Sequence, residues 1–366
     1  MGIHMLALAE ELTAASIDVT VAYWPAPATE AMMSRAPRLG VRIARTPHPR
    51  DPAYSAALTS LVRSLAPDVF HVHVGTGREN FGGARAARAA GVAAVVETLH
   101  MPWMMRSPRK REAFFASLDA VDRLIVVSEA QRATYERIGV PTTQMRTVPN
   151  GVVPRKTGYG RDAARRLLGL NRHRPVLMTV GRLAVQKGHR HLIDALPRLL
   201  ETWPDLVAIV AGDGHLRDAL EDHAARLGVG HALHLIGHRT EVRALLDAAD
   251  VFVLPSRQEG MPMAALEAMD AALPVVATHV TGTSEVVDHG VTGWLVQPGD
   301  PRQIADAIAT LLSDDALRRR FGDAGRRLYR ERFTAERMTA ETLAVYAETL
   351  GRTACSIGPT SLGAAR

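Results

Sequence analysis

The sequence predicts an α/β fold with two doubly wound parallel sheets, and three observations support this. The chain has 366 residues, which suits about two domains. Short β-branched runs alternate with longer segments rich in Ala, Leu and Arg. A stretch rich in Pro and Gly at 148–160 interrupts the alternation, which then begins again. Two successive arrays of this kind indicate two parallel sheets, each covered by helices on both faces.

The first array contains five runs that are typical of buried parallel strands. Helical segments follow them, for example at 53–66 and 83–90. The five runs lie at 17–23, 41–46, 68–74, 93–99 and 123–128.

The chain starts with a helical pattern instead of a strand. Residues 3–16, IHMLALAEELTAAS, are amphipathic, and they lack the basic region and the cleavage site of a signal peptide. A doubly wound domain usually opens with a strand and a glycine-rich turn, of which only Gly2 is present. We therefore expect the opening strand of the first domain to be missing, and we hypothesise that the natural chain starts further upstream.

The second array contains six runs of the same kind. The turn Asn150-Gly151 before it favours a positive φ. We expect domains at 1–155 and 156–333, a helix at about 334–350 that packs back on the first domain, and a flexible tail at 351–366. The six runs lie at 175–180, 206–212, 233–237, 251–255, 274–280 and 293–298.

Composition excludes several classes of protein. Hydrophobic residues make up 47% and charged residues 22%, as in folded globular chains. The single cysteine, Cys355, excludes a disulfide framework, cysteine-ligated zinc and iron–sulfur clusters. No apolar run is long enough to span a bilayer. A cytoplasmic location is the default expectation.

The basic excess lies mainly in the first half of the chain. Residues 1–155 carry 18 Lys and Arg against 13 Asp and Glu, which is +5 of the total +6. The densest group comprises Arg106, Arg109, Lys110 and Arg111. It is either a solvated helix start or a surface for a membrane or an anionic substrate. Aromatic residues are only 5%, which argues against nucleic acid.

Two cations stand at the end of a predicted strand of the second array. Arg182 follows the strand 175–180, and Lys187 precedes the next helix. A guanidinium fork, an ammonium and a helix N-terminus together form a site for a pyrophosphate. A strand–loop–helix turn with no ligand remains the alternative.

Two carboxylates follow another strand of the second array. Glu259 lies in the loop after 251–255, and Glu267 lies about two turns into the next helix. That separation is too large for an acid–base pair on one glycosidic carbon, but it suits two hydroxyl pairs of one long ligand. The amides of Met263 and Ala264 at the helix start favour an anion. Taken alone, Glu267 would be a helix-surface residue.

Histidines cluster in the first array. His100 ends the strand 93–99, where a structural role competes with a catalytic one. His71 and His73 share one strand face, but no third ligand stands at a suitable spacing, so we expect no metal site. His189 and His191 flank a helix start and are expected at the surface.

The motifs, taken in order, resemble the family 4 glycosyltransferases, which have the GT-B fold of two Rossmann-like domains. The likeness is strong in the second domain and weaker in the first. In the second domain it rests on GRLAVQKG (181–188), AGDG (211–214), PSRQEGMPMAALEAM (255–269) and TGTSEVVDHGVTGWLVQPGD (281–300). In the first it rests on HVHVG (71–75), TLH (98–100), VS (127–128) and VPNGV (148–152).

The resemblance implies a retaining hexosyltransferase that uses a UDP- or GDP-linked sugar, with the leaving diphosphate as proton acceptor and with no metal or other cofactor. It implies four catalytic residues, namely His100, Arg182, Lys187 and Glu259. Donor-binding residues would be Arg182, Lys187, Gly212, His238, Arg239, Glu259, Met263, Ala264 and Glu267. Arg182 and Lys187 match the phosphate pair, Glu267 the ribose carboxylate, Glu259 the sugar carboxylate, and 237–239 the loop near the base.

On the acceptor side we place Gly2, His73, Arg106 and Arg109. In relatives, the loop of which only Gly2 is present approaches the donor phosphates and the acceptor. The expected partners are a nucleotide sugar and a sugar, lipid-linked or small-molecule acceptor, with peripheral contact at the inner membrane face.

Three other functions compete with this reading. A GT-B nucleotide-sugar epimerase is disfavoured by the motif that holds Glu259 and Glu267. A scaffold that binds the donor without turnover, or a partner subunit, remains open. A dinucleotide dehydrogenase is disfavoured because no GxGxxG loop follows a first strand.

Overall fold

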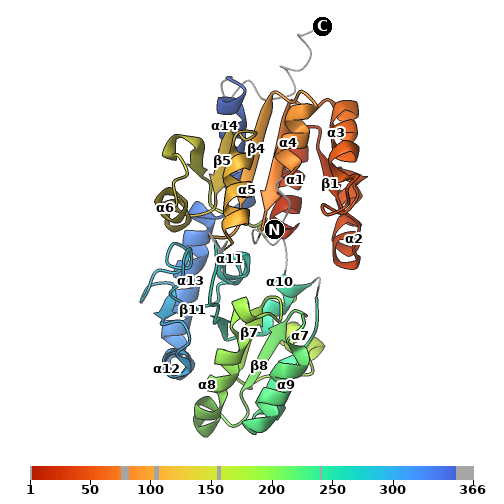
Figure 1. Ribbon diagram of the computed structural model, residues 1–366. Helices are drawn as coiled ribbons and strands as arrows, with labels where there is room; N and C mark the ends of the chain where they lie inside the picture. Colours follow the sequence, from red (N-terminus) through yellow and green to blue (C-terminus); the bar gives the residue numbers. More distant parts are fainter. Residues whose placement is uncertain (1, 76–81, 103–106, 155–157, 240, 352–366) are drawn as a thin grey trace. The chain divides into compact units, whose positions relative to one another are not determined.

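The computed structural model describes residues 2–75, 82–102, 107–154, 158–239 and 241–351. The chain divides into two compact units (Figure 1). Unit 1 comprises Met1–Val153 and Thr334–Arg366, and unit 2 comprises Pro154–Phe333. Both consist of parallel strands and helices, as the sequence predicts.

The strands of unit 1 are all parallel and form two sheets in the described residues. One has the order β1-β2 and the other β3-β4-β5-β6. All five predicted runs are strands, whereas the short β6 escaped prediction. The strands are β1 (Thr20–Tyr23), β2 (Arg42–Arg45), β3 (Val69–Val74), β4 (Ala94–Leu99), β5 (Arg123–Val126) and β6 (Met145–Thr147).

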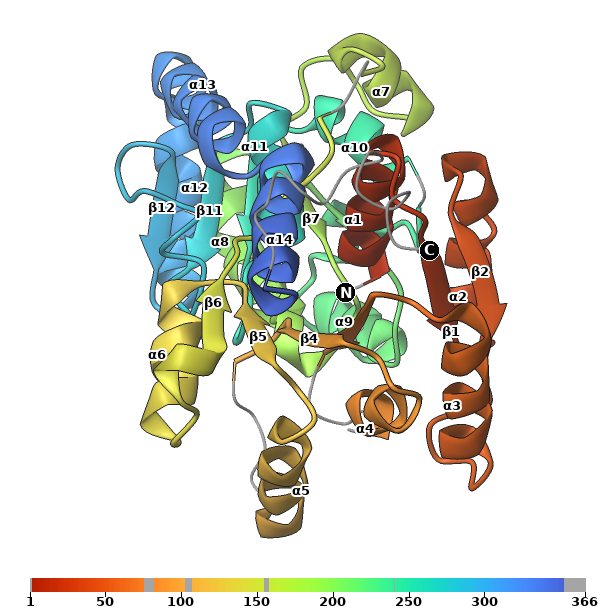
Figure 2. The same ribbon diagram turned by 90° about the horizontal axis from the view of Figure 1, so that it is seen from above.

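Helices cover both faces of the four-stranded sheet. Along β4, Val95 and Leu99 pack into one apolar cluster with the helices α3 to α6, while Val96 packs into another with α1 and α14. Figure 2 shows α1 and α14 side by side. The helices are α1 (Gly2–Ala14), α2 (Pro27–Met33), α3 (Tyr54–Leu65), α4 (Gly82–Ala89), α5 (Pro108–Leu118), α6 (Glu129–Arg137) and α14 (Ala335–Thr349).

Helix α1 is the first element that the structure describes, and no strand precedes it there. The strands β1 and β2 form a small sheet of their own. Tyr23 of β1, Met33 of α2 and Val41 before β2 pack in one apolar cluster with Leu6 and Ala9 of α1.

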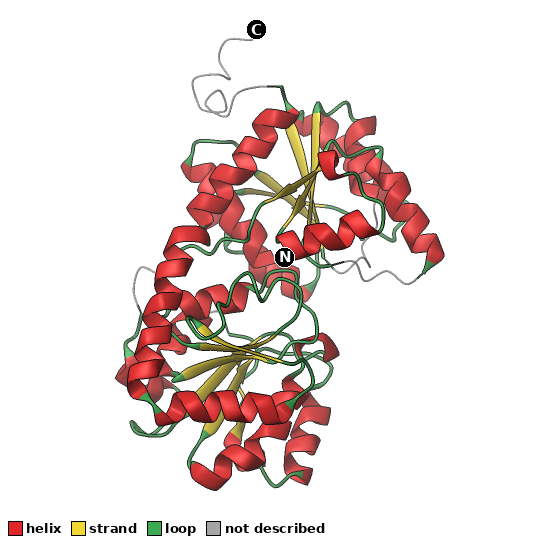
Figure 3. Ribbon diagram, turned by 90° about the vertical axis from the view of Figure 1, so that its left-hand side faces the viewer, coloured by secondary structure: helices red, strands yellow, loops and turns green. Residues whose placement is uncertain are grey.

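Unit 2 has one sheet of six parallel strands, with helices on both faces (Figure 3). Its order, β12-β11-β10-β7-β8-β9, reverses direction between β7 and β10. The six strands are β7 (Val176–Val180), β8 (Val207–Ala211), β9 (Leu233–Leu235), β10 (Val251–Leu254), β11 (Val275–Thr278) and β12 (Gly293–Val296). The helices are α7 (Arg161–Leu167), α8 (His189–Thr202), α9 (Arg217–Arg226), α10 (Val242–Leu245), α11 (Met263–Asp270), α12 (Pro301–Ser313) and α13 (Asp315–Arg332).

The reversal of strand order determines where unit 2 can bind a ligand. In an open α/β sheet, the helices after the two strands at the reversal lie on opposite faces, and a crevice opens at the carboxyl ends of these strands. Both predicted motifs, at Arg182–Lys187 and at Glu259–Glu267, follow these two strands, β7 and β10.

Gly151 differs from the prediction. It is not among the residues with a positive φ. A Cβ at this position would instead lie 2.3 Å from the backbone oxygen of Thr334. The glycine therefore allows close backbone contact at the start of α14, where Val152 also bridges Thr334.

No helix in the described ranges has the length and apolar character needed to cross a bilayer.

Candidate functional site

Four loops of unit 2 meet at the carboxyl ends of its strands, and glycines let their backbones touch. A Cβ on Gly212 would lie 1.9 Å from the carbonyl oxygen of Gly181. A Cβ on Gly188 would lie 2.0 Å from that of Pro255, and one on Gly282 would lie 1.6 Å from that of Gly260. The loops after β7, β8, β10 and β11 therefore form one rigid floor.

The loop after β7 holds the two predicted cations. Arg182 is exposed, and Lys187 is the last residue of a short 3₁₀ turn, η3 (Val185–Lys187). Gly188 follows with φ 62°, which turns the chain into α8.

His189, the first residue of α8, is hydrogen-bonded to the backbone of this loop. It is buried, so the expectation of a surface position was wrong. The His189 Nε2–H donates to the carbonyl oxygen of Arg182 at 3.1 Å. Burial lowers the pKa of His189 to about 4, so the imidazole is neutral at pH 7. The other predicted surface histidine, His191, is partly exposed.

Lys187 reaches the loop after β10. Its Nζ lies 2.7 Å from Oε1 of Glu259, and the Ser256 hydroxyl donates to the same oxygen at 2.6 Å. The Glu259 side chain is 5% exposed and that of Lys187 20%. The structure thus brings together two residues that the sequence placed in separate motifs, 72 positions apart.

Helix α11 carries the second carboxylate. Glu267 is buried, so the alternative of a helix-surface residue is wrong. Met263 and Ala264 form the first turn and are partly exposed. Pro262, which has no N–H to satisfy, stands at the N-cap in an extended conformation.

The loops after β8 and β9 are joined. The Gly212 N–H donates to the carbonyl oxygen of Gly237 at 2.9 Å. The next two residues, His238 and Arg239, are exposed, and Arg239 Nε donates to the carbonyl oxygen of Ile236 at 3.0 Å. This contact places the predicted 237–239 loop beside Gly212.

Unit 1 brings its histidines together at the carboxyl ends of β3 and β4. His100 directly follows β4, is buried, and shares a 3.0 Å hydrogen bond between its Nε2 and Nδ1 of His73. His4 of α1 packs edge-on against His100, with ring centroids 4.5 Å apart. One ring nitrogen of each of these three lies within 4.8 Å of the others. His4 and His100 therefore lie close enough to His73 to be further potential metal ligands, although the spacing along the sequence does not indicate them.

A second pair of contacts holds His71. Its Nδ1 lies 2.6 Å from the Tyr346 hydroxyl, and its Nε2 lies 2.7 Å from Oγ1 of Thr98. Sequence reasoning missed His4 and Tyr346 because the contacts join distant elements, and no spacing along the chain signals them.

The remaining predicted residues of unit 1 are less closely connected. Gly2 begins α1, and a Cβ there would overlap the sulfur of Met32. Arg109 is exposed in the first turn of α5. Arg106 lies outside the described residues.

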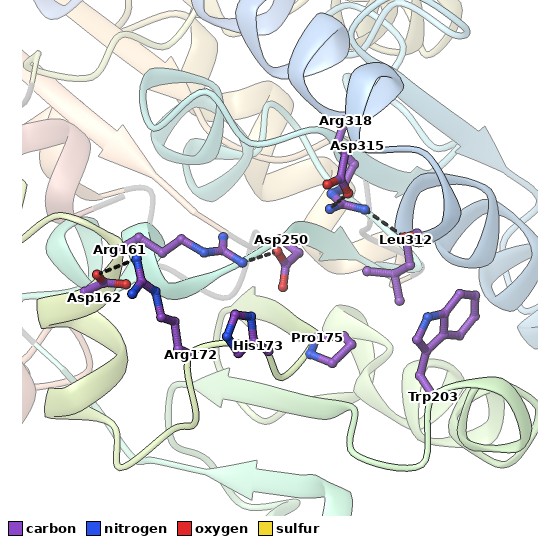
Figure 4. A pocket seen from close by; sticks show the side chains of 10 residues that line it. All are labelled: Arg161, Asp162, Arg172, His173, Pro175, Trp203, Asp250, Leu312, Asp315 and Arg318. Atoms are coloured by element: carbon purple, nitrogen blue, oxygen red, sulfur yellow. Dashed lines mark hydrogen bonds and ion pairs between the residues drawn. The ribbon is translucent and has the colours of Figure 1, made fainter.

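Unit 2 also has a pocket of about 530 Å³ at the amino ends of the central strands β7 and β10 (Figure 4). It contains none of the predicted site residues. Asp250, just before β10, accepts hydrogen bonds there from Arg161 at 2.6 Å and from the buried Arg165 at 2.9 Å. It also accepts one from the backbone N–H of Val176 at 2.8 Å, so this carboxylate connects the amino ends of β7 and β10 to α7.

The arrangement in unit 2 suits an extended polyanion that also bears hydroxyl groups. Arg182 and Lys187 offer positive charge near the start of α8. Glu259 and Glu267 offer acceptors for hydroxyls at two points. Among the described residues, the floor of loops that carries them is complete within unit 2.

Comparison with known families agrees with this geometry. Residues 1–156 match the family model described as Glycosyltransferase Family 4, and residues 160–328 match that described as Glycosyl transferases group 1. The chain is a family 4 glycosyltransferase. It is therefore a transferase enzyme, and the sequence-based assignment is confirmed.

Curated relatives carry several different activities. One is the UDP-Gal:alpha-D-GlcNAc-diphosphoundecaprenol alpha-1,3-galactosyltransferase of Escherichia coli, which is 29% identical over 275 residues, 71% of this chain and 70% of that protein. Another is the glycogen synthase of Mycobacterium tuberculosis, 34% identical over 231 residues, 62% of this chain and 54% of that protein. The chain thus spans between about half and about seven-tenths of these relatives.

Solved structures confirm the GT-B fold. The Anabaena HepE structure in complex with UDP-glucose has a TM-score of 0.80 and 22% identity, and the match covers 96% of this chain and 95% of that one. WaaG, a glycosyltransferase involved in lipopolysaccharide biosynthesis, has a TM-score of 0.70 and 18% identity, covering 94% and 95%.

Proposed function

We propose that this glycosyltransferase moves a hexosyl group from a UDP-linked sugar to an acceptor hydroxyl with retention of configuration. The observation that carries the proposal is the cation pair Arg182 and Lys187, set after β7 beside a helix start, with Lys187 in contact with Glu259 in the loop after β10. The complex of HepE with UDP-glucose and the UDP-Gal donor of the Escherichia coli relative support the choice of UDP over GDP.

Each site residue has a proposed role. Arg182 and Lys187 bind the diphosphate and stabilise its growing negative charge as it leaves. Glu267 accepts hydrogen bonds from the ribose hydroxyls, and Glu259 from the sugar hydroxyls. His100 contacts the donor sugar.

Residues around the floor complete the donor site in this proposal. The exposed residues His238 and Arg239 lie near the base, with Gly212 beside them. The first-turn amides of Met263 and Ala264 face the phosphates.

The proposed step balances without a carboxylate base. The bond between the anomeric carbon and the diphosphate oxygen breaks, and a bond from that carbon to the acceptor oxygen forms on the same face. The acceptor proton passes to the departing diphosphate oxygen. Because the chain's own cations neutralise the diphosphate, we propose that transfer requires no metal cofactor.

We further propose a lipid-linked acceptor and peripheral contact with the inner membrane face. The exposed residues Arg109, Lys110 and Arg111 form a basic group at the start of α5. The diphosphoundecaprenol acceptor in the name of the Escherichia coli relative supports the same class. Gly2 and His73 are assigned to the acceptor side of the reaction.

The test begins with a thermal-shift screen of nucleotide sugars, because a bound donor raises the melting temperature by mass action. Incubation of the best binder with polyprenyl-diphosphate sugars should then give a glycoside with the configuration of the donor, as read by proton NMR. A product of inverted configuration would refute retention. Conversion of the donor alone to its epimer would indicate an epimerase, and binding without any turnover would indicate a scaffold.

A further inference from the structure

Three histidines of unit 1 converge from three separate elements. His4 lies in the first turn of α1, His73 near the end of β3, and His100 just after β4. One ring nitrogen of each lies within 4.8 Å of the other two. His73 Nδ1 and His100 Nε2 are already only 3.0 Å apart.

The three rings are in the protonation state that binds metals. Burial lowers the pKa of His4 to about 3 and keeps the pKa values of His73 and His100 well below 6.5. Neutral imidazoles are the form that ligates a metal ion.

One nitrogen of this cluster lacks a partner. His4 is only 3% exposed, and its Nδ1 has no hydrogen bond to any residue that the structure describes. A buried polar atom without a partner is unfavourable, so a ligand that uses its lone pair would be stabilised.

We propose that His4, His73 and His100 bind one Zn²⁺-like transition-metal ion, and that this ion inhibits the transferase. Imidazole nitrogens suit Zn²⁺, Co²⁺, Ni²⁺ and Cu²⁺, whereas Mg²⁺ and Ca²⁺ require oxygen ligands. Three protein nitrogens leave a fourth tetrahedral position for water. The inhibitory part rests on the proposed function, in which His100 contacts the donor sugar, because an ion would occupy that side chain.

The geometry requires little rearrangement. Zn–N bonds of about 2.0–2.1 Å place two ligand nitrogens about 3.3 Å apart in a tetrahedron. The His73–His100 pair is close to this value, and His4 has to approach by at most about 1.5 Å. The ring that donates the proton in the hydrogen bond between His73 and His100 must carry that proton on its other nitrogen when the ion binds. All three rings then stay neutral, and no proton is released.

A neighbouring histidine supports the ligand set. The His71 ring stacks on that of His73, with centroids 4.2 Å apart and planes at 30°. Both His71 nitrogens are held, by Tyr346 and Thr98, so His71 orients His73 and does not itself offer a free nitrogen. Such outer contacts commonly fix the rings of metal-binding histidines.

The test is titration of the full chain, freed of metal by a chelator, with Zn²⁺ by calorimetry and with Co²⁺ by visible absorption. We expect one ion per chain and the intense absorption of tetrahedral Co²⁺. His4→Gln should weaken binding at least ~10²-fold, since even outer contacts of a ligand contribute about 10- to 100-fold. His231→Gln, which alters an exposed histidine of unit 2, should bind as the wild type does.

The outcomes separate this proposal from the proposed function, because the binding arm needs no turnover. Absence of a one-to-one complex in the wild type, or equal affinity in His4→Gln, overturns the site. His73→Gln serves as a second ligand variant if His4→Gln does not fold. With an active donor and acceptor, Zn²⁺ but not Mg²⁺ should inhibit transfer reversibly, and His4→Gln should lose this sensitivity. Full activity with the ion bound would overturn the inhibitory role.

Discussion

Removal of the Lys187 ammonium should lower both the folding stability and the rate of transfer, each through a different interaction. In Lys187→Met, Oε1 of Glu259 loses its ion pair and keeps the Ser256 hydroxyl. Breaking a buried ion pair costs about 3–5 kcal/mol. The Lys187 side chain is 20% exposed, so water can partly replace it, and we expect about 3 kcal/mol.

The assay is thermal unfolding together with initial rates of transfer. For a unit of this size, 1 kcal/mol corresponds to about 2–4 °C, so the melting temperature of unit 2 should fall by about 6–12 °C. The transfer rate should fall by at least ~10²-fold, the scale for losing one donor that stabilises developing charge.

A matched double variant tests the stability effect. In Lys187→Met with Glu259→Gln, no uncompensated carboxylate is buried, so most of the stability should return. Transfer is compared in the single variant, at a temperature at which it stays folded, because Glu259 is itself assigned to the donor sugar. A single variant that transfers within about threefold of the wild type would refute the phosphate role.

Three further outcomes follow from the structure. Because the pKa of His189 is about 4 when folded and about 6.5 when unfolded, the unfolded state binds the extra proton as the pH falls. The free energy of unfolding should thus drop by about 2 kcal/mol from pH 7 to pH 5, as measured by unfolding at each pH. The same dependence of that free energy on pH in His189→Gln would contradict this. Gly188→Ala should destabilise the chain well beyond the ~1–2 kcal/mol of a left-handed alanine, and it should weaken donor binding. The control Gly228→Ala, at φ 72° with open space around it, should show only the backbone strain. Equal melting temperatures of the two variants would contradict the close approach of Gly188 to Pro255. Arg109→Gln with Lys110→Gln should weaken binding to anionic vesicles about 30-fold in sedimentation, at about 1 kcal/mol for each charge, and unaltered binding would exclude this surface.

Local patterns were sufficient to predict most of the fold. Each predicted strand run contains an observed strand, because β-branched runs between helical segments signal buried parallel strands. The strand β6, three residues long, escaped because so short a run has no period of its own. Gly151 was misread because a sequence cannot distinguish a glycine needed for positive φ from one needed for close approach to Thr334.

Motif residues within one loop were predictable, whereas their partners were not. The placement of Lys187 and Glu259 after neighbouring strands follows from the sheet order, but the 2.7 Å contact between them depends on how the loops pack. The burial of His189 likewise depends on the carbonyl oxygen of Arg182 above it. His4 carried no signal at all, because its partners lie on other elements about 70 and 96 positions away.

The central claim is that Arg182 and Lys187 bind the diphosphate of a UDP-linked sugar, and calorimetric titration with UDP-hexoses tests it most directly. The wild type should bind one donor per chain. Arg182→Gln should weaken binding about 10- to 150-fold, since hydrogen bonds to charged groups contribute about 1.5–3 kcal/mol. The nearby exposed Arg190→Gln should bind as the wild type does. Equal affinity in the wild type and in Arg182→Gln would contradict the account.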